Sequence, residues 1–288
     1  MTRVRSIEGN RQRLDGGAMY GNCPRAVWQK WSPPDEQNRI SLACRALLVE
    51  SGGLRVLLET GIGAFFEPKL RDRFGVEPER HVLLESLAAA GTSHEAIDVV
   101  ILSHLHFDHA GGLLSEWQQD RASELLFPAA RFVTSRAAFE RATHAHDRDR
   151  ASFVPGLAEK LAASGRLDLV DDSRAVPPSL PADVFSFETS EGHTPGLLLT
   201  TVRGPRGPIT FTSDLIPGAP WVHVPITMGY DRFPERLIEE KQALLERVVA
   251  SGGWLAFTHD PNVAAAKVAR DPSGRFSAAE PQPVVDWS

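Results

Sequence analysis

Apolar residues recur in short runs separated by polar and glycine-rich turns, and these runs predict the strands. Residues 45–50 and 54–59 flank Ser51-Gly52-Gly53, a pattern typical of a β-hairpin. Residues 97–103 form a continuous apolar run rich in β-branched side chains, which favours a strand buried on both faces. Further strands are predicted at residues 131–134, 167–170, 184–189, 208–212 and 254–258.

Helices are predicted where apolar residues recur at helical spacing. Residues 78–90 begin with Pro78, which suits a first helical turn, and are followed by Gly91. Residues 234–250 place a stripe of apolar side chains on one face and are followed by Ser251-Gly252-Gly253. Shorter helices are predicted at residues 135–143 and 157–163, and residues 141–156 read as a long polar surface loop.

The alternation of strands and helices indicates an α/β or α+β protein in which helices cover sheets. No proline- and glycine-rich linker divides the chain, so we expect residues 1–288 to form a single domain. Residues 1–17 are charged and predict a loose N-terminal segment. Residues 271–288 lack periodicity and predict an irregular tail.

Composition narrows the class of protein. Hydrophobic residues make up 42% and charged residues 24%, as in an ordinary soluble globular protein. The net charge of -6 without a basic run argues against a nucleic-acid partner and leaves a small-molecule substrate as the expectation. Cys23 and Cys44 read as free thiols of a reducing compartment. The N-terminus lacks the apolar region of a signal peptide, and no apolar run approaches the ~20 residues of a membrane span, so we expect a cytoplasmic protein with no membrane partner.

Four metal-capable side chains fall within six residues directly after the predicted strand at 97–103: His104, His106, Asp108 and His109. Residues two apart on an extended segment point the same way. Imidazole and carboxylate are ligands for zinc, and manganese, iron and cobalt also accept them. The alternative is a histidine-rich surface loop. Burying four uncompensated polar groups beside a buried strand would cost several kcal/mol, so the pattern predicts a metal site.

Three further candidate ligands share a position with His104. His193, Asp214 and His259 each lie just past the end of an apolar run. Ligands in α/β proteins gather where loops converge at strand ends. A carboxylate such as that of Asp214 is suited to bridging two cations. We therefore expect these residues to meet the His104 group.

The order of these motifs resembles the metallo-β-lactamase superfamily over about residues 40–261. The motifs are H-x-H-x-D-H at 104–109, G-H-T-P-G at 192–196, Ser213-Asp214, and a strand ending in His259. The resemblance implies a four-layer αββα sandwich and two divalent metal ions per chain, with zinc the expected metal. It implies one site at His104, His106 and His193, a second at Asp108, His109 and His259, and Asp214 as the bridge.

More narrowly, residues 14–21, 103–112, 213–217 and 228–231 resemble the branch containing quorum-quenching N-acyl-homoserine lactonases and organophosphate hydrolases. Three positions depart from that pattern. Glu59 stands where the family usually has Asp, Leu197 follows the G-H-T-P-G motif where another His is common, and Pro217 replaces the tyrosine of characterised lactonases.

The hypothesis from sequence is hydrolysis of a lactone or ester by a metal-bridging hydroxide. Asp108 would accept or deliver the proton, and Tyr230 or His223 would supply the polar group absent at Pro217. An apolar substrate pocket is expected from residues that the sequence leaves equally open to a core role: Met19, Tyr20, Phe65, Phe66, Phe107, Trp221, Met228 and Tyr230.

Several alternatives stay open on the sequence. A phosphoester or organophosphate hydrolase and a glyoxalase II-like thioester hydrolase would use the same metals. An RNA-processing nuclease is disfavoured by the acidic charge. A non-catalytic metal-binding protein is the alternative from another class. Hydrophobic residues at 14–28 and 221–230 would suit either a homodimer face or a substrate lid.

Overall fold

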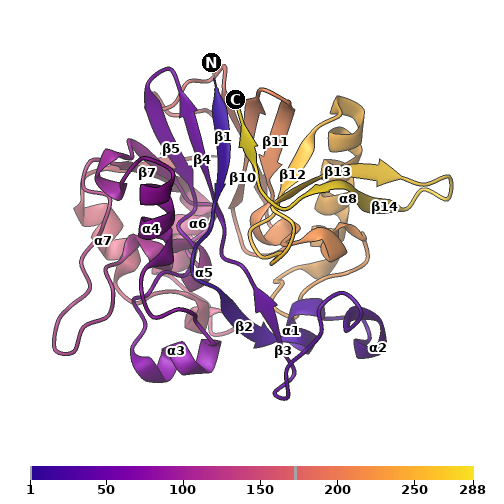
Figure 1. The fold of residues 1–288 in the computed structure, drawn as a ribbon, viewed down its shortest axis with the longest axis horizontal. Helices are drawn as coiled ribbons and strands as arrows, with labels where there is room; N and C mark the ends of the chain where they lie inside the picture. Colours follow the sequence, from indigo (N-terminus) through magenta and orange to yellow (C-terminus); the bar gives the residue numbers. More distant parts are fainter. Residues whose placement is uncertain (1, 172–173) are drawn as a thin grey trace.

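The hairpin expected around Ser51 lies at the centre of a seven-stranded sheet in the computed structural model, which describes residues 2–171 and 174–288 (Figure 1). The hairpin strands are antiparallel, and the next three strands run parallel to the second of them. The sheet order is β15 (Asp286–Trp287), β1 (Arg3–Ile7), β4 (Ala46–Ser51), β5 (Leu54–Leu58), β6 (Val99–Ile101), β7 (Arg131–Ser135) and β8 (Leu167–Val170).

A second, six-stranded sheet comes from the C-terminal half. It includes β10, an apolar strand that the sequence analysis missed because it directly follows the G-H-T-P-G motif. β11 and β12 are parallel neighbours, so their carboxyl ends meet at one edge. The order is β14 (Phe276–Gln282), β13 (Ala265–Arg270), β12 (Trp254–Ala256), β11 (Gly207–Phe211), β10 (Leu197–Gly204) and β9 (Phe185–Ser190).

Three apolar cores define a four-layer αββα sandwich, as the resemblance implied. The central core joins the inner faces of both sheets, through side chains such as Leu58 and Phe211. One outer core packs helices α4 (Val82–Ala89), α6 (Arg136–Thr143) and α7 (Leu157–Ala163) on the first sheet, and the other packs α8 (Pro234–Ser251) on the second. Strands from both halves of the chain contribute to this central core, and the single domain stays a prediction.

All four predicted helices are present, one of them with a corrected start, whereas the helices at 16–20, 25–28, 68–74 and 107–110 were not predicted. The predicted helix 78–90 starts later, at Val82, because Asn10 Nδ2 donates to the carbonyls of Pro78 and Arg80 and withdraws them from helical pairing. No helix in the described ranges is both long and apolar enough to cross a membrane. The helices are α1 (Gly16–Tyr20), α2 (Arg25–Trp28), α3 (Pro68–Phe74), α4 (Val82–Ala89), α5 (Phe107–Ala110), α6 (Arg136–Thr143), α7 (Leu157–Ala163) and α8 (Pro234–Ser251). Short 3₁₀ turns are η1 (His94–Ala96), η2 (Gly111–Leu113), η3 (Arg150–Ser152), η4 (Ser213–Leu215) and η5 (Ala219–Val222).

Both chain ends are more ordered than their composition predicted. Within the expected loose segment 1–17, β1 pairs with β4 and with β15, and β2 (Gln12–Asp15) pairs with β3 (Arg39–Leu42). Within the expected irregular tail, β14 pairs with β13. Val4 lies opposite Trp287. β1 and β15 are held by partners far away in the chain, which local periodicity does not reveal, whereas β14 pairs with its neighbour in sequence, β13.

Candidate metal centre

The predicted hexad follows β6 as a tight, buried loop. His104 lies three residues after the last residue of β6, and α5 is a single turn that begins directly after His106. All four candidate ligands of the loop are at most 8% exposed. The loop exits through Gly112, where a Cβ atom would lie 2.1 Å from the carbonyl oxygen of Thr60. The close approach requires glycine and fixes the path of the loop against the first sheet.

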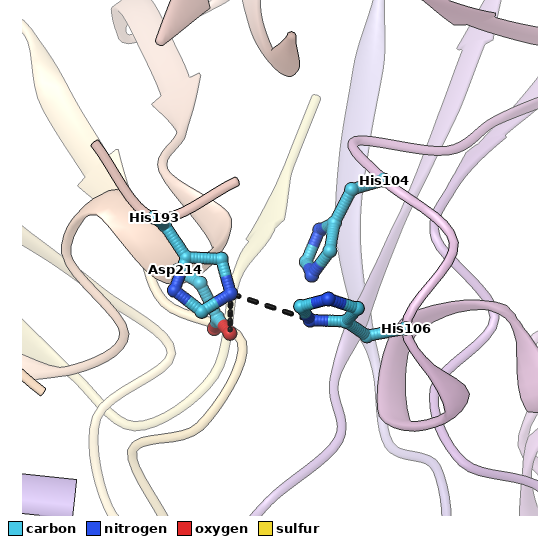
Figure 2. A group of neighbouring side chains, drawn as sticks. All are labelled: His104, His106, His193 and Asp214. Atoms are coloured by element: carbon cyan, nitrogen blue, oxygen red, sulfur yellow. Dashed lines mark hydrogen bonds and ion pairs between the residues drawn. The ribbon is translucent and has the colours of Figure 1, made fainter. Parts of the chain in front are cut away.

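The remaining candidate ligands enter from the second sheet. His193 lies between β9 and β10, Asp214 lies in η4 after β11, and His259 lies just after β12. Because β11 and β12 are parallel, Asp214 and His259 reach the same edge. Figure 2 shows His193 and Asp214 facing His104 and His106 across the gap between the two halves. The structure therefore brings all seven predicted side chains to one place.

One group of donors consists of His104, His106, His193 and Asp214, whose ligand atoms all lie within 4.8 Å of one another. His193 Nε2 lies 3.1 Å from Asp214 Oδ2 and 3.3 Å from His106 Nδ1 (Figure 2). The Nε2 atoms of His104 and His106 are buried without a hydrogen-bond partner in the described residues. Buried nitrogens of this kind are costly unless a cation or a proton binds them.

The second group consists of Asp108, His109 and His259. His109 Nε2 and His259 Nε2 are 3.3 Å apart, and Asp108 oxygens lie 3.6 and 3.5 Å from them. Asp214 also touches this group, because its two oxygens lie 3.3 Å from His109 Nε2 and 3.2 Å from His259 Nε2. The Asp214 carboxylate thus lies between the two groups.

The Nδ1 atoms of His109, His193 and His259 are held by hydrogen bonds to groups outside the cluster. His259 Nδ1 donates to the carbonyl oxygen of Ala43 at 2.7 Å, His109 Nδ1 to Glu59 at 2.9 Å, and His193 Nδ1 to Asp231 at 2.9 Å. With the proton on Nδ1, each neutral ring turns the Nε2 lone pair inward. Lone pairs and carboxylates that converge in this way repel one another, so the donor set fits divalent cations.

The pKa values of the clustered side chains also indicate a donor set that fits divalent cations. Burial alone would lower the pKa of His109, but the carboxylates of Glu59, Asp214 and Asp108 outweigh burial and raise this pKa well above its ordinary value. Carboxylates likewise outweigh burial to raise the pKa of His259. Burial would raise the pKa of Asp214, but His109 and the neighbouring imidazoles hold it well below its ordinary value. Without a metal ion, protons on His109 and His259 balance the charge of the ionised carboxylates, and metal uptake must displace these protons.

Glu59 connects the loops of this centre through hydrogen bonds. Its carboxylate accepts hydrogen bonds from Ser103 Oγ, from Ser213 Oγ at 2.8 Å and from Thr258 Oγ1 at 3.3 Å, besides His109. These residues follow β6, β11 and β12. The departure from the family's Asp therefore lies directly behind a candidate ligand. Of the other departures, Leu197 is buried in the core, and the carbonyl of Pro217 accepts from the backbone N–H of His259 at 2.9 Å.

A cavity of about 280 Å³ opens over the candidate ligands. Of the eight side chains expected to line an apolar pocket, Met19, Phe107, Met228 and Tyr230 do so. The other four pack in the protein: Tyr20 stacks on Trp221, and Phe65 packs against Phe66. The pocket is completed by Leu14, which belongs to the hydrophobic residues 14–28 considered for a lid or a dimer face, and by residues that carried no local signal in the sequence: Arg73, Phe74, Arg148, Ala151 and Ser152.

The two residues considered as substitutes for the missing lactonase tyrosine lie in different places. Tyr230 lines the pocket mouth, where burial and then the nearby Asp108 raise the pKa of its phenol to about 12. The phenol therefore stays protonated and acts as a hydrogen-bond donor at neutral pH. His223 is exposed and lines a separate hollow with Arg270 and Phe276, so the structure does not bring it to the candidate centre.

Gln12 is a contact of this centre that the sequence analysis missed. Its Nε2 donates to Asp108 Oδ2 at 2.7 Å from β2, and its side chain is fully buried. A single Gln in a segment expected to be loose carries no recognisable signal. The pairing of β2 with β3 places it there.

Fold and donor set together define a metal-dependent hydrolase scaffold, and comparison with protein families agrees. The model of the metallo-β-lactamase superfamily matches residues 41–259. The chain belongs to this superfamily and is an enzyme of its hydrolase type.

Similar proteins include a curated relative and several solved structures. An N-acyl homoserine lactonase from a Bacillus species is 28% identical over 196 residues, which cover 63% of this chain and 66% of that protein. A Staphylococcus aureus protein described as a "probable metal-dependent hydrolase" superposes with a TM-score of 0.84 at 24% identity, covering 98% of both chains. AidC, a dizinc quorum-quenching lactonase, superposes with a TM-score of 0.75 at 21% identity, covering 98% of this chain and 94% of AidC. At these identities the superpositions establish the fold.

Proposed function

We propose that this protein is a dinuclear metal hydrolase that cleaves a lactone or ester, with zinc as its metal. The observation that carries the proposal is the position of Asp214, whose oxygens lie within 3.3 Å of histidine nitrogens from both donor groups. His104, His106 and His193 would hold one cation and Asp108, His109 and His259 the other, with Asp214 shared between them. When bound, the cations would supply the Lewis acidity that activates water and polarises a carbonyl oxygen at neutral pH.

Asp108 is proposed to move the proton. Gln12 holds Asp108 Oδ2, which fixes the orientation of the carboxylate at the pocket wall. From there Asp108 can take the proton of the attacking water and deliver it to the leaving alcohol. The phenol of Tyr230, kept protonated by its raised pKa, is placed to donate a hydrogen bond to the substrate oxygen that becomes negatively charged.

The apolar wall supports a substrate with a hydrocarbon part. Phe74 and Phe107 pack ring against ring with 4.6 Å between centroids, and Met19 and Met228 line the same cavity. Methionine side chains adapt to irregular apolar shapes. The curated relative named as an N-acyl homoserine lactonase supports a lactone as the first substrate class to test.

The test combines metal counting with a substrate panel. The protein is purified without chelator, its metals are measured by elemental analysis, and it is assayed on a lactone, an aryl ester, a phosphotriester and a thioester. About two transition-metal ions per chain and preferred turnover of the lactone or aryl ester, lost in Asp108→Ala, are the expected results. Arg150→Met, outside the candidate centre, is the control. One ion or none, with no turnover after zinc, manganese or iron is added, would contradict the dinuclear proposal.

A further inference from the structure

A second, open hollow adjoins the candidate metal pocket. It has a volume of about 560 Å³ and shares two lining residues with the metal pocket, Arg148 and Met228. His146 and Arg232 line it as well. The two hollows therefore adjoin each other at Arg148 and Met228.

The two arginines of the hollow are held in place without a carboxylate partner in the described part of the chain. Arg148 Nη2 donates to the carbonyl oxygens of Gly229 at 2.8 Å and Asp231 at 3.3 Å. Arg232 Nη1 faces His146 Nδ1 at 3.4 Å, and its Nε is buried without a hydrogen-bond partner. Backbone carbonyls orient a guanidinium but leave its positive charge uncompensated.

His146 adds a further donor to this hollow. Its Nδ1 accepts a hydrogen bond of 3.1 Å from the backbone N–H of Arg148. With Nδ1 used as an acceptor, the neutral ring carries its proton on Nε2. The hollow is thus lined by two guanidinium groups and one imidazole N–H.

Asp231, the acidic residue that lines this hollow, already accepts hydrogen bonds from other groups. Asp231 is 2% exposed, and its oxygens accept from His193 Nδ1 at 2.9 Å and from the backbone N–H of Met228 at 2.6 Å. Among the described residues, its carboxylate forms no ion pair with Arg148 or Arg232. In a chain with a net charge of -6, this local excess of positive charge stands out.

We propose that this hollow is an anion subsite and that the enzyme takes a lactone or ester with a second, anionic group away from the bond that is cleaved. The inference rests on the proposed function, because the substrate carbonyl is placed at the candidate metal centre. A carboxylate or phosphate would pair with the guanidinium groups of Arg148 and Arg232 through charge-assisted hydrogen bonds.

Matched esters test the substrate preference. The metal-loaded protein is assayed on mono-4-nitrophenyl adipate and on its neutral methyl ester, in which only the distal carboxylate is capped. We expect kcat/KM to be at least about tenfold higher for the anionic ester, the size of one charge-assisted hydrogen bond. Salt should reduce this ratio. A phosphonate-ended ester of the same length separates a phosphate-bearing substrate from a carboxylate-bearing one.

Arginine variants assign the preference to the hollow. Arg148→Met and Arg232→Met are expected to bring the ratio of the two esters to within about twofold. Arg148→Lys, which keeps the charge, is expected to retain part of the preference. Arg150→Met is the matched control, because Arg150 lies in the same loop, pairs with Asp147 and lines a different cavity. A ratio near one in the parent protein, or a ratio that persists in both methionine variants, would overturn the inference.

Equilibrium binding decides the inference independently of turnover. Adipate and monomethyl adipate are titrated into the metal-loaded protein by calorimetry. The parent protein and Arg150→Met should bind adipate at least about tenfold more tightly, and Arg148→Met should bind the two equally. A parent protein that hydrolyses neither 4-nitrophenyl ester can still bind adipate more tightly than monomethyl adipate. If this preference is lost in Arg148→Met, the proposed reaction is contradicted and the anion subsite is supported. Equal affinity of the parent protein for adipate and monomethyl adipate would contradict the anion subsite.

Discussion

Gln12 donates a 2.7 Å hydrogen bond to Asp108, and this contact joins the N-terminal strand pair to the candidate metal centre. The amide fixes one oxygen of a carboxylate that we propose as both ligand and proton acceptor. Asp108 is part of a one-turn helix, so it depends on such an outside contact for its orientation.

We therefore expect Gln12→Leu to lower kcat by about tenfold while metal content stays near that of the parent, because geometry at Asp108 is loosened. Steady-state kinetics and elemental analysis measure these two quantities. A kcat in Gln12→Leu equal to that of the parent would argue against a role of this hydrogen bond in orienting Asp108.

Replacement of Glu59 is expected to weaken metal binding. In Glu59→Gln the hydrogen bond to His109 loses its charge, and groups that orient a ligand in this way are worth about 10–100-fold in metal affinity. Glu59→Asp keeps the charge and should retain more affinity than Glu59→Gln. Competition with a chromogenic chelator measures the affinity. Equal affinity in Glu59→Gln and the parent protein would contradict a role in orienting His109.

Tyr230→Phe is expected to lower kcat on the preferred lactone or ester by about 10–100-fold, since one donor to the developing negative charge is lost. KM and metal content should change little. His223→Phe is a matched control, because His223 lines a separate hollow. Stopped-flow measurement of a single turnover separates the chemical step from product release. A rate in Tyr230→Phe equal to that of the parent would remove Tyr230 from the mechanism.

Lys241 makes the stability of the fold depend on pH. It is fully buried on α8, donates to the carbonyl oxygen of Ile226 at 2.5 Å, and burial lowers its pKa from 10.5 to about 7. Between these two pH values the unfolded chain binds more protons than the folded protein, so this residue makes stability rise as pH rises from about 7 toward 10.5. Below pH 7 the penalty is fully present and is on the order of several kcal/mol.

Urea unfolding of the parent and of Lys241→Met at pH 7 and pH 9.5 tests this effect. Contributions from other groups cancel in the difference between the two proteins. Relative to Lys241→Met, the parent should gain stability at the higher pH. A difference in unfolding free energy that does not change with pH would contradict a lowered pKa at Lys241.

The sequence by itself determined those parts of the protein whose candidate ligands, or whose apolar positions, lie close together along the chain. His104 to His109 follow an apolar strand within one loop, and this spacing alone indicates a metal site. Periodicity also predicted the β4–β5 hairpin, β6 and helix α8, because their apolar faces repeat at the spacing of the element. The order of the four motifs then indicated the fold that the family comparison supports.

Only the tertiary structure decided which distant residues meet. β1 and β15 read as loose ends, yet they close one edge of a sheet because each finds a partner more than two hundred residues away. Strand pairing brings Gln12 to Asp108, and loop packing brings Arg148 to the pocket, and neither leaves a local pattern in the sequence. His223 and Tyr230 lie seven residues apart, and the path of the chain sends one to the metal pocket and the other away. Contacts between remote segments depend on three-dimensional packing, whereas spacing records only neighbours along the chain.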